Sequence, residues 1–143
     1  MDAVVLLNTI NLTSGVGFLL AGAAGCTVRR RGRFWEATGY AWRHPRAAAF
    51  TVGSVVISRD RLSEGVWRHE ESHIRQYAVL GPAFWPAYAL ACGWSWLRTG
   101  DWWSRNAFER RAGLSAGGYR ERPVRRFARR SRPGGPAAGA VTA

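Results

Sequence analysis

Residues 63–80 read SEGVWRHEESHIRQYAVL, and this stretch decides the fold. Apolar residues, aromatic residues and two histidines recur in it at intervals of three and four, which is the spacing of one helix face. Gly81 and Pro82 follow directly and are typical of a helix end. The sequence therefore predicts a single helix over these residues.

The predicted helix contains His69-Glu70-Glu71-Ser72-His73, which is an H-E-x-x-H motif. Residues at i and i+4 share a helix face, with Cβ atoms about 6 Å apart, so His69 and His73 can bind one metal ion. Glu70 is not placed to bind the ion, but it can take a proton from a water on zinc. The alternative is a surface helix with two solvated histidines and an ion pair between Glu71 and Arg75.

A catalytic zinc site needs a third protein ligand and keeps a fourth position open for water. Glu109 is the preferred candidate because it lies 36 residues after His73, on a helix predicted over 104–114. One intervening apolar helix lets it fold back antiparallel onto the motif helix. Asp101 and His44 are the alternatives, and Glu109 could instead form an ion pair with a neighbouring arginine.

A strand, an H-E-x-x-H helix and a Glu on a later helix together resemble the gluzincin group of zinc metallopeptidases. His73-Ile74-Arg75-Gln76 is similar to the H-x-x-Q continuation in a family of small bacterial H-E-x-x-H proteins without a defined substrate. The Leu80-Gly81-Pro82 stretch and residues 106–112 also resemble that family, so the resemblance covers roughly residues 50–119. The chain departs from these peptidases at Glu71, where they have an apolar or small residue.

The resemblance implies a Zn²⁺ ion held by His69, His73 and Glu109, with Glu70 as the catalytic base. It also implies electrophilic help from a nearby side chain, and the available phenols are Tyr77 and Tyr119. A full zincin has a larger sheet whose edge strand lies along the substrate, so this chain would be a minimal version.

The remaining pattern predicts an α+β fold that is mostly helical. Residues 50–57 are rich in β-branched side chains and predict a strand, with which 34–40 could pair as a short β-hairpin across a turn at 44–46. A further helix is predicted over 83–97, in an uncharged run that is interrupted by prolines at 82 and 86.

Two long stretches carry no charge, and the first runs from Ala3 to Val28 before a cluster of arginines at 29–33. It is long enough to span a membrane with the arginines in the cytoplasm, but its polar residues and glycines also suit a segment buried in the domain. A cleaved signal is a third reading, although the positive region that a signal needs is missing. The second stretch, Ala78–Leu97, is interrupted by prolines and favours a buried or half-inserted helix.

The chain has 143 residues, of which 47% are hydrophobic and 21% charged, so one folded domain fits and global disorder is excluded. Its 21 basic residues are all arginine, the net charge is +12, and its two cysteines exclude a disulfide-stapled scaffold. Residues 120–143 carry seven arginines and predict a basic, disordered tail that either contacts an anionic membrane surface or stays solvated and inert. Nucleic acid is an unlikely partner because Phe127 is the tail's one aromatic residue for base stacking.

The sequence thus divides into an apolar segment over 1–28, a zincin-like metal-binding domain over 29–119 and the basic tail. It predicts a zinc-dependent metallopeptidase or hydrolase that acts on a peptide or protein, associated with a membrane and with its catalytic part in the cytoplasm. The alternatives are a non-catalytic, membrane-associated basic protein whose metal site is structural or vestigial, and a soluble cytoplasmic location.

Overall fold

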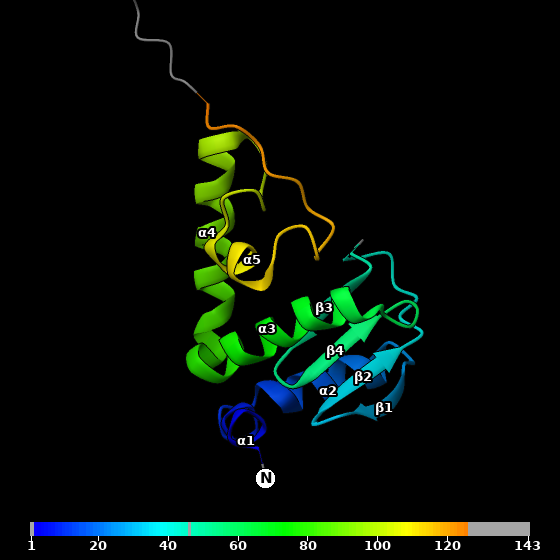
Figure 1. Cartoon of the computed structure of the whole chain (residues 1–143). Coiled ribbons are helices and arrows are strands. Elements are labelled where there is room, and N and C mark those ends of the chain that lie inside the picture. Colours follow the sequence, from blue (N-terminus) through cyan, green and yellow to red (C-terminus); the bar gives the residue numbers. More distant parts are fainter. Residues whose placement is uncertain (1, 46, 126–143) are drawn as a thin grey trace, which may run out of the picture.

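The computed structural model describes residues 2–45 and 47–125 and has an α+β fold, as the sequence predicts (Figure 1). The N-terminal half holds two helices followed by four strands: α1 (Ala3–Ile10), α2 (Thr13–Ala23), β1 (Thr27–Arg31), β2 (Phe34–Thr38), β3 (Ala49–Val52) and β4 (Val55–Ser58). The C-terminal half is helical: α3 (Glu64–Leu80), a short 3₁₀ turn (Gly81–Ala83), α4 (Phe84–Thr99) and α5 (Ala107–Ala112). In Figure 1, α3 crosses the middle of the molecule, with α1, β1 and β2 on one side of it and α5 on the other.

The four strands form one mixed sheet in the order β1-β2-β4-β3. The predicted single strand over 50–57 is wrong, because the chain reverses at Gly53 and Ser54 and makes the antiparallel hairpin β3–β4. Gly53 has φ of +60°, a backbone conformation that suits glycine and permits this tight reversal. The pairing predicted for 34–40 is right only in part, since β2 pairs with β4 in parallel and not in a hairpin. β3 is consequently an edge strand.

The sheet is covered by a helix on each face. On one face α2 and the sheet share a core of alanines, β-branched residues and one tyrosine: Ala21, Ala24, Ala37, Tyr40, Val55 and Ile57. On the other face α3 packs against a second core: Phe34, Val56, Trp67 and Ile74. Because side chains alternate along a strand, β4 serves both cores and is buried throughout. The motif helix is thereby fixed on the sheet.

The β3–β4 turn also anchors the two N-terminal helices. The backbone N–H of Ser54 donates to the Ser14 hydroxyl at 3.2 Å, and Asn8 donates to the Ser54 hydroxyl at 3.2 Å. A Cβ atom on Gly53 would lie 2.3 Å from the Ser14 nitrogen, so α2 could not approach the turn this closely with any other residue there. The uncharged N-terminal segment is therefore built into the domain.

No single helix in the described part of the chain is long and apolar enough to cross a membrane, whereas α1 and α2 together have that length and composition but are bent by 79°. The arginines that follow this segment in the sequence lie in strand β1 and the turn after it.

The helices α3 and α4 begin and end close to where the sequence predicts, whereas α5 is shorter than predicted. Ser63 caps the start of α3 by accepting a hydrogen bond from the Val66 N–H, and Gly81 ends it. The helix predicted over 104–114 is shorter in the structure and forms α5. Asp101 accepts hydrogen bonds from the backbone N–H groups of 103 and 104 and holds a turn there. Asn106 then caps the short α5.

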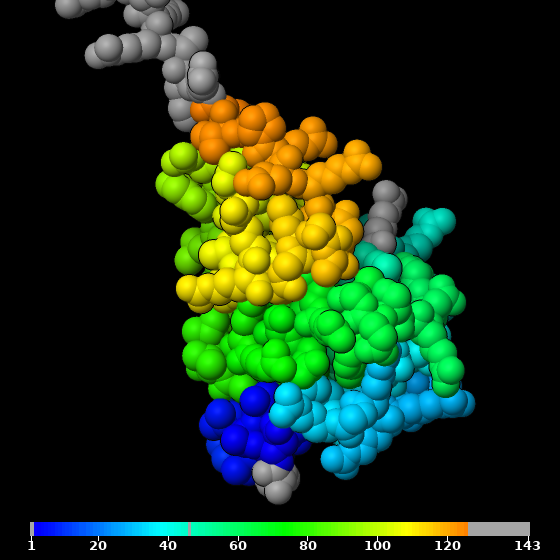
Figure 2. All heavy atoms as spheres, in the orientation of Figure 1, coloured from blue at the N-terminus to red at the C-terminus, as the bar shows by residue number. Residues whose placement is uncertain are grey.

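The first residues of the predicted basic tail lie on the domain. The Arg122 N–H donates to the Ser104 hydroxyl at 2.6 Å, and the Arg125 N–H donates to the Arg98 carbonyl at 2.8 Å. Figure 2 shows the yellow-to-orange surface of α5 and the segment after it resting on the green surface of α3. The rest of the predicted tail, from residue 126, lies outside the described residues.

Candidate metal centre

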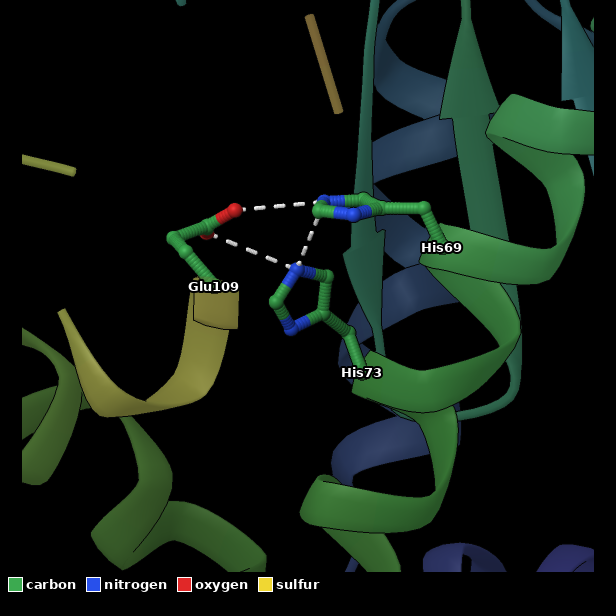
Figure 3. Close-up of side chains that lie close together, drawn as sticks. All are labelled: His69, His73 and Glu109. Atoms are coloured by element: carbon green, nitrogen blue, oxygen red, sulfur yellow. Dashed lines mark hydrogen bonds and ion pairs between the residues drawn. The ribbon is translucent and has the colours of Figure 1, made fainter. Parts of the chain in front are cut away.

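Three side chains converge between α3 and α5. His69 and His73 project from one face of α3, and Glu109 points at them from α5 (Figure 3). The two Nε2 atoms lie 3.2 Å apart, Oε2 of Glu109 lies 3.2 Å from Nε2 of His69, and its Oε1 lies 3.5 Å from Nε2 of His73. All three residues are buried. The structure thus brings together the three residues that the sequence predicts as ligands.

The spacing of these atoms fits a metal ion. A tetrahedral zinc ion with ligands about 2.0–2.1 Å away places neighbouring ligand atoms about 3.3 Å apart, which matches the distances above. Oε2 of Glu109 is buried and has no hydrogen-bond partner in the described residues, so a lone pair is left pointing at the imidazoles. His69, His73 and Glu109 therefore form a buried cluster that could hold a metal ion.

A second layer of contacts fixes both imidazoles. Nδ1 of His69 donates to the Gly113 carbonyl at 3.1 Å, and Nδ1 of His73 donates to the Gln76 side-chain oxygen at 2.8 Å. Gln76 is itself held by donating to the Phe108 carbonyl at 3.1 Å. Because Nδ1 donates in each ring, Nε2 on the side of Glu109 is the atom left to bind a metal ion when the imidazole is neutral. The H-x-x-Q continuation thus has a physical role that the motif alone did not reveal.

Two further contacts at the centre were missed by the sequence analysis. The Tyr88 hydroxyl donates to Oε1 of Glu109. A Cβ atom on Gly117 would lie 2.8 Å from Nε2 of His69 and 2.5 Å from its Cε1, so only glycine allows this close passage over the ring. Tyr88 stands in an apolar run and Gly117 in a loop, and neither carries a recognisable spacing signal.

The carboxylate and the imidazole shift one another's protonation. Burial opposes a charged Glu109, but the adjacent His69 imidazole, the hydrogen bond from Tyr88 and the His73 imidazole hold its pKa below the ordinary value. Burial likewise opposes a charged His69, but the Glu109 carboxylate raises the pKa of His69 above its ordinary value. Glu109 is therefore ionised at neutral pH, as a metal ligand must be.

Glu70 lies beside this centre on the sheet side of α3. Its Oε2 accepts a hydrogen bond of 2.7 Å from the hydroxyl of Thr51, which belongs to the edge strand β3. Burial raises the pKa of Glu70, and the Thr51 bond opposes that rise in part. A carboxyl group whose pKa is moved toward neutrality is suited to accept and return a proton.

The centre opens into a cavity of about 680 Å³ between α2, β3, α3 and α4. Its walls are mainly apolar and include Leu20, Phe50, Val52, Trp85 and Trp103. Its polar groups are the three clustered side chains, Glu70, Thr51 and three phenols: Tyr77, Tyr88 and Tyr119. Both tyrosines named from the resemblance thus face the cavity, and no arginine lines it among the described residues.

Three other residues considered from the sequence lie elsewhere. Asp101 uses its carboxylate in the turn before α5, and His44 is exposed in the loop between β2 and β3. Glu71 points away from the centre, with a 2.6 Å contact to Arg75 and a 3.2 Å contact to Arg33. The second carboxylate of the motif is therefore an ordinary surface partner of arginines.

In comparisons with known proteins, no family model, no curated protein and no solved structure matched this chain. The gluzincin resemblance accordingly stays a prediction from the motif.

Proposed function

We propose that this protein is a zinc-dependent hydrolase of peptide bonds. The observation that carries the proposal is the buried trio of His69, His73 and Glu109 with a separate carboxylate, Glu70, in the same cavity. Two imidazoles and one carboxylate are a ligand set of catalytic zinc sites. Zinc held there would act as a Lewis acid on a carbonyl oxygen and lower the pKa of a water to about 7.

The surroundings of the trio favour a catalytic site over a structural one. Structural zinc sites are closed by four protein ligands. Here the described residues supply three, and the trio faces a cavity large enough for part of a substrate. A structural zinc site, one form of the non-catalytic alternative, would be closed, and this arrangement does not favour it.

Glu70 is the residue that moves the proton. Thr51 holds Oε2, so the other oxygen is the one that takes a proton from the attacking water and returns it to the leaving nitrogen. The raised pKa of Glu70 makes its protonated form easier to reach during this transfer. Tyr88, by donating to Glu109, keeps that carboxylate turned toward the imidazoles.

The edge strand offers a place for an extended peptide. β3 pairs with β4 on one side only, and it carries both Thr51 and the cavity residues Phe50 and Val52. A peptide added beside such a strand gains main-chain hydrogen bonds, and alternate side chains enter the neighbouring pockets. Because the cavity is apolar, we expect cleavage next to apolar or aromatic residues.

The test uses the full chain, zinc and a broad mixture of peptides whose cleavage is read by mass spectrometry. Glu70→Gln should keep bound zinc and lose roughly 10²–10⁴-fold in cleavage rate, which is the usual contribution of a general base. Glu71→Gln is the matched control and should keep both properties. Equal cleavage by Glu70→Gln would contradict the role of Glu70, and a zinc-loaded wild type that cleaves no peptide would contradict the proposal as a whole.

A further inference from the structure

The helices α1 and α2 expose their large apolar residues and bury their polar ones. The exposed side chains include Leu6, Leu7, Ile10, Leu12, Phe18 and Leu19, the last of which is 75% exposed. The buried positions of the same two helices are polar or small: Asn8, Thr13, Ser14, Gly17 and Ala21. A helix at a water-facing surface shows the opposite arrangement.

The inner polar groups of these helices are fully engaged. Asn8 donates to the Ile74 carbonyl at 3.1 Å as well as to the Ser54 hydroxyl, and Asn11 donates to the Tyr77 carbonyl at 3.1 Å. Polar side chains turned inward and bonded, with apolar ones turned outward, are typical of helices that lie against lipid.

Helix α4 repeats the pattern. It buries Phe84 and Ser95, and Ser95 donates to the Asp101 carbonyl at 2.6 Å. Its exposed side chains are Trp85, Leu90, Trp94, Trp96 and Leu97, with Leu90 76% exposed. We call these five, with the six exposed residues of α1, α2 and the bend between them given above, the outer apolar shell. Its two parts lie near the same cavity, which Leu20 of α2 and Trp85 of α4 both line.

Arginines border the shell and stack on aromatic rings. The Arg98 guanidinium lies 5.3 Å from the Trp94 ring centre, and that of Arg125 lies 5.8 Å from Trp96. On the other part, Arg30 lies 5.5 Å from the ring of Trp35, which packs against Phe18 of the shell. Tryptophan with an adjacent arginine is typical of the boundary between lipid tails and head groups.

We propose that the outer apolar shell inserts into a lipid bilayer with anionic head groups. The side chains of the shell contact the lipid tails. The positively charged arginines at its border attract the negatively charged phosphates of the head groups. A second copy of this chain fits the face less well, because a face-to-face dimer would bring two arginine borders together. The proposal is independent of hydrolysis and of zinc.

The test is flotation of the full chain with vesicles of phosphatidylcholine, with and without phosphatidylglycerol. Wild type should bind both, more strongly when the anionic lipid is present, and added salt should remove only the difference. Leu19→Glu and Leu90→Glu should each weaken binding roughly 10–100-fold, because a charge is placed at the lipid contact. Both residues are exposed, so circular dichroism, melting and zinc content should stay unchanged.

Gly65→Glu is the control for charge. It adds the same charge in the first turn of α3, where a Cβ atom meets nothing within 4 Å, and it should bind vesicles like wild type. The proposal is overturned if wild type does not float with vesicles, or if Leu19→Glu and Leu90→Glu float as well as Gly65→Glu. It is also overturned if the lipid-free chain is a defined dimer that both leucine variants turn into monomers without any vesicle binding.

Discussion

Helices α3 and α4 follow one another and have nearly the same length, 17 and 16 residues, yet they sort their side chains in opposite ways. α3 buries ionisable residues, among them His69 and Glu70, and carries ordinary surface ion pairs on its outer side. α4 is uncharged up to Arg98 and turns leucine and tryptophan outward. The contrast shows that the apolar residues are not all inside and the ionisable ones are not all outside: α3 buries ionisable groups at the candidate metal centre, whereas α4 exposes apolar side chains.

The largest effect should come from removing one side of the centre on α3. His69→Ala takes away an imidazole from a set of three, and we expect the chain to lose zinc binding altogether, measured by metal analysis after gel filtration. His44→Ala removes the exposed histidine and should keep a full equivalent of zinc. If His69→Ala and His44→Ala bound zinc equally, His69 would not be a zinc ligand, and the ionisable residues that α3 buries would not form a metal site.

A smaller effect should follow from crowding the same imidazole without removing it. Gly117→Ala places a methyl group where the His69 ring lies, so the ring or the loop must shift and Nε2 of His69 moves relative to Glu109. We expect zinc affinity to fall about 10–100-fold, the usual cost of disturbing the groups that orient a ligand. Competition with a chromogenic chelator measures this.

Gly93→Ala is the matched substitution on α4, where a Cβ atom meets nothing within 4 Å. Its zinc affinity should equal that of wild type. An unchanged affinity in Gly117→Ala would mean that the loop after α5 does not hold His69 in place.

The contribution of the inward polar contacts of α1 can be measured through the stability of the protein. Asn8 is completely buried and bonds to the turn and to α3, so Asn8→Ala should lower the free energy of unfolding by about 1–3 kcal/mol in denaturant titrations. Thr9→Ala, at the exposed neighbouring position, should have a much smaller effect. If the two variants were equally stable, the inward polar contacts would not hold the helix.

The smallest effect is expected on the outer side of α3. Glu71→Gln removes contacts with Arg33 and Arg75, which are exposed and screened by solvent. Zinc affinity should not change, and the free energy of unfolding should fall less than in Asn8→Ala. A loss of zinc in Glu71→Gln would place the second carboxylate of the motif at the metal after all.

The sequence was most informative where local physics decides the outcome. The helix boundaries at Ser63 and Gly81, the shared face of His69 and His73, and the return of Glu109 from a later helix all follow from caps, period and spacing. These features depend on a few neighbouring residues or on one short connection.

The features that escaped the sequence analysis depend on contacts between distant segments. The parallel pairing of β2 with β4 needs a crossover that no local pattern encodes, and the reversal at Gly53 divides what reads as one continuous strand. Tyr88 gains its role only because α4 passes beside α5. The outward leucines of α1 and α2 were visible as an uncharged run, but which face each side chain takes is set by packing on the sheet.

The turn at Gly53 and Ser54 links the unfolding of the two halves of the molecule. It joins α1, α2 and the hairpin whose first strand holds Thr51 against Glu70. The N-terminal helices and the half that carries the candidate metal centre should therefore unfold as one cooperative unit, with the Ser54 amide among the slowest to exchange with deuterium. A protease that clips the chain between α2 and β1 would then loosen the support of Glu70 as well.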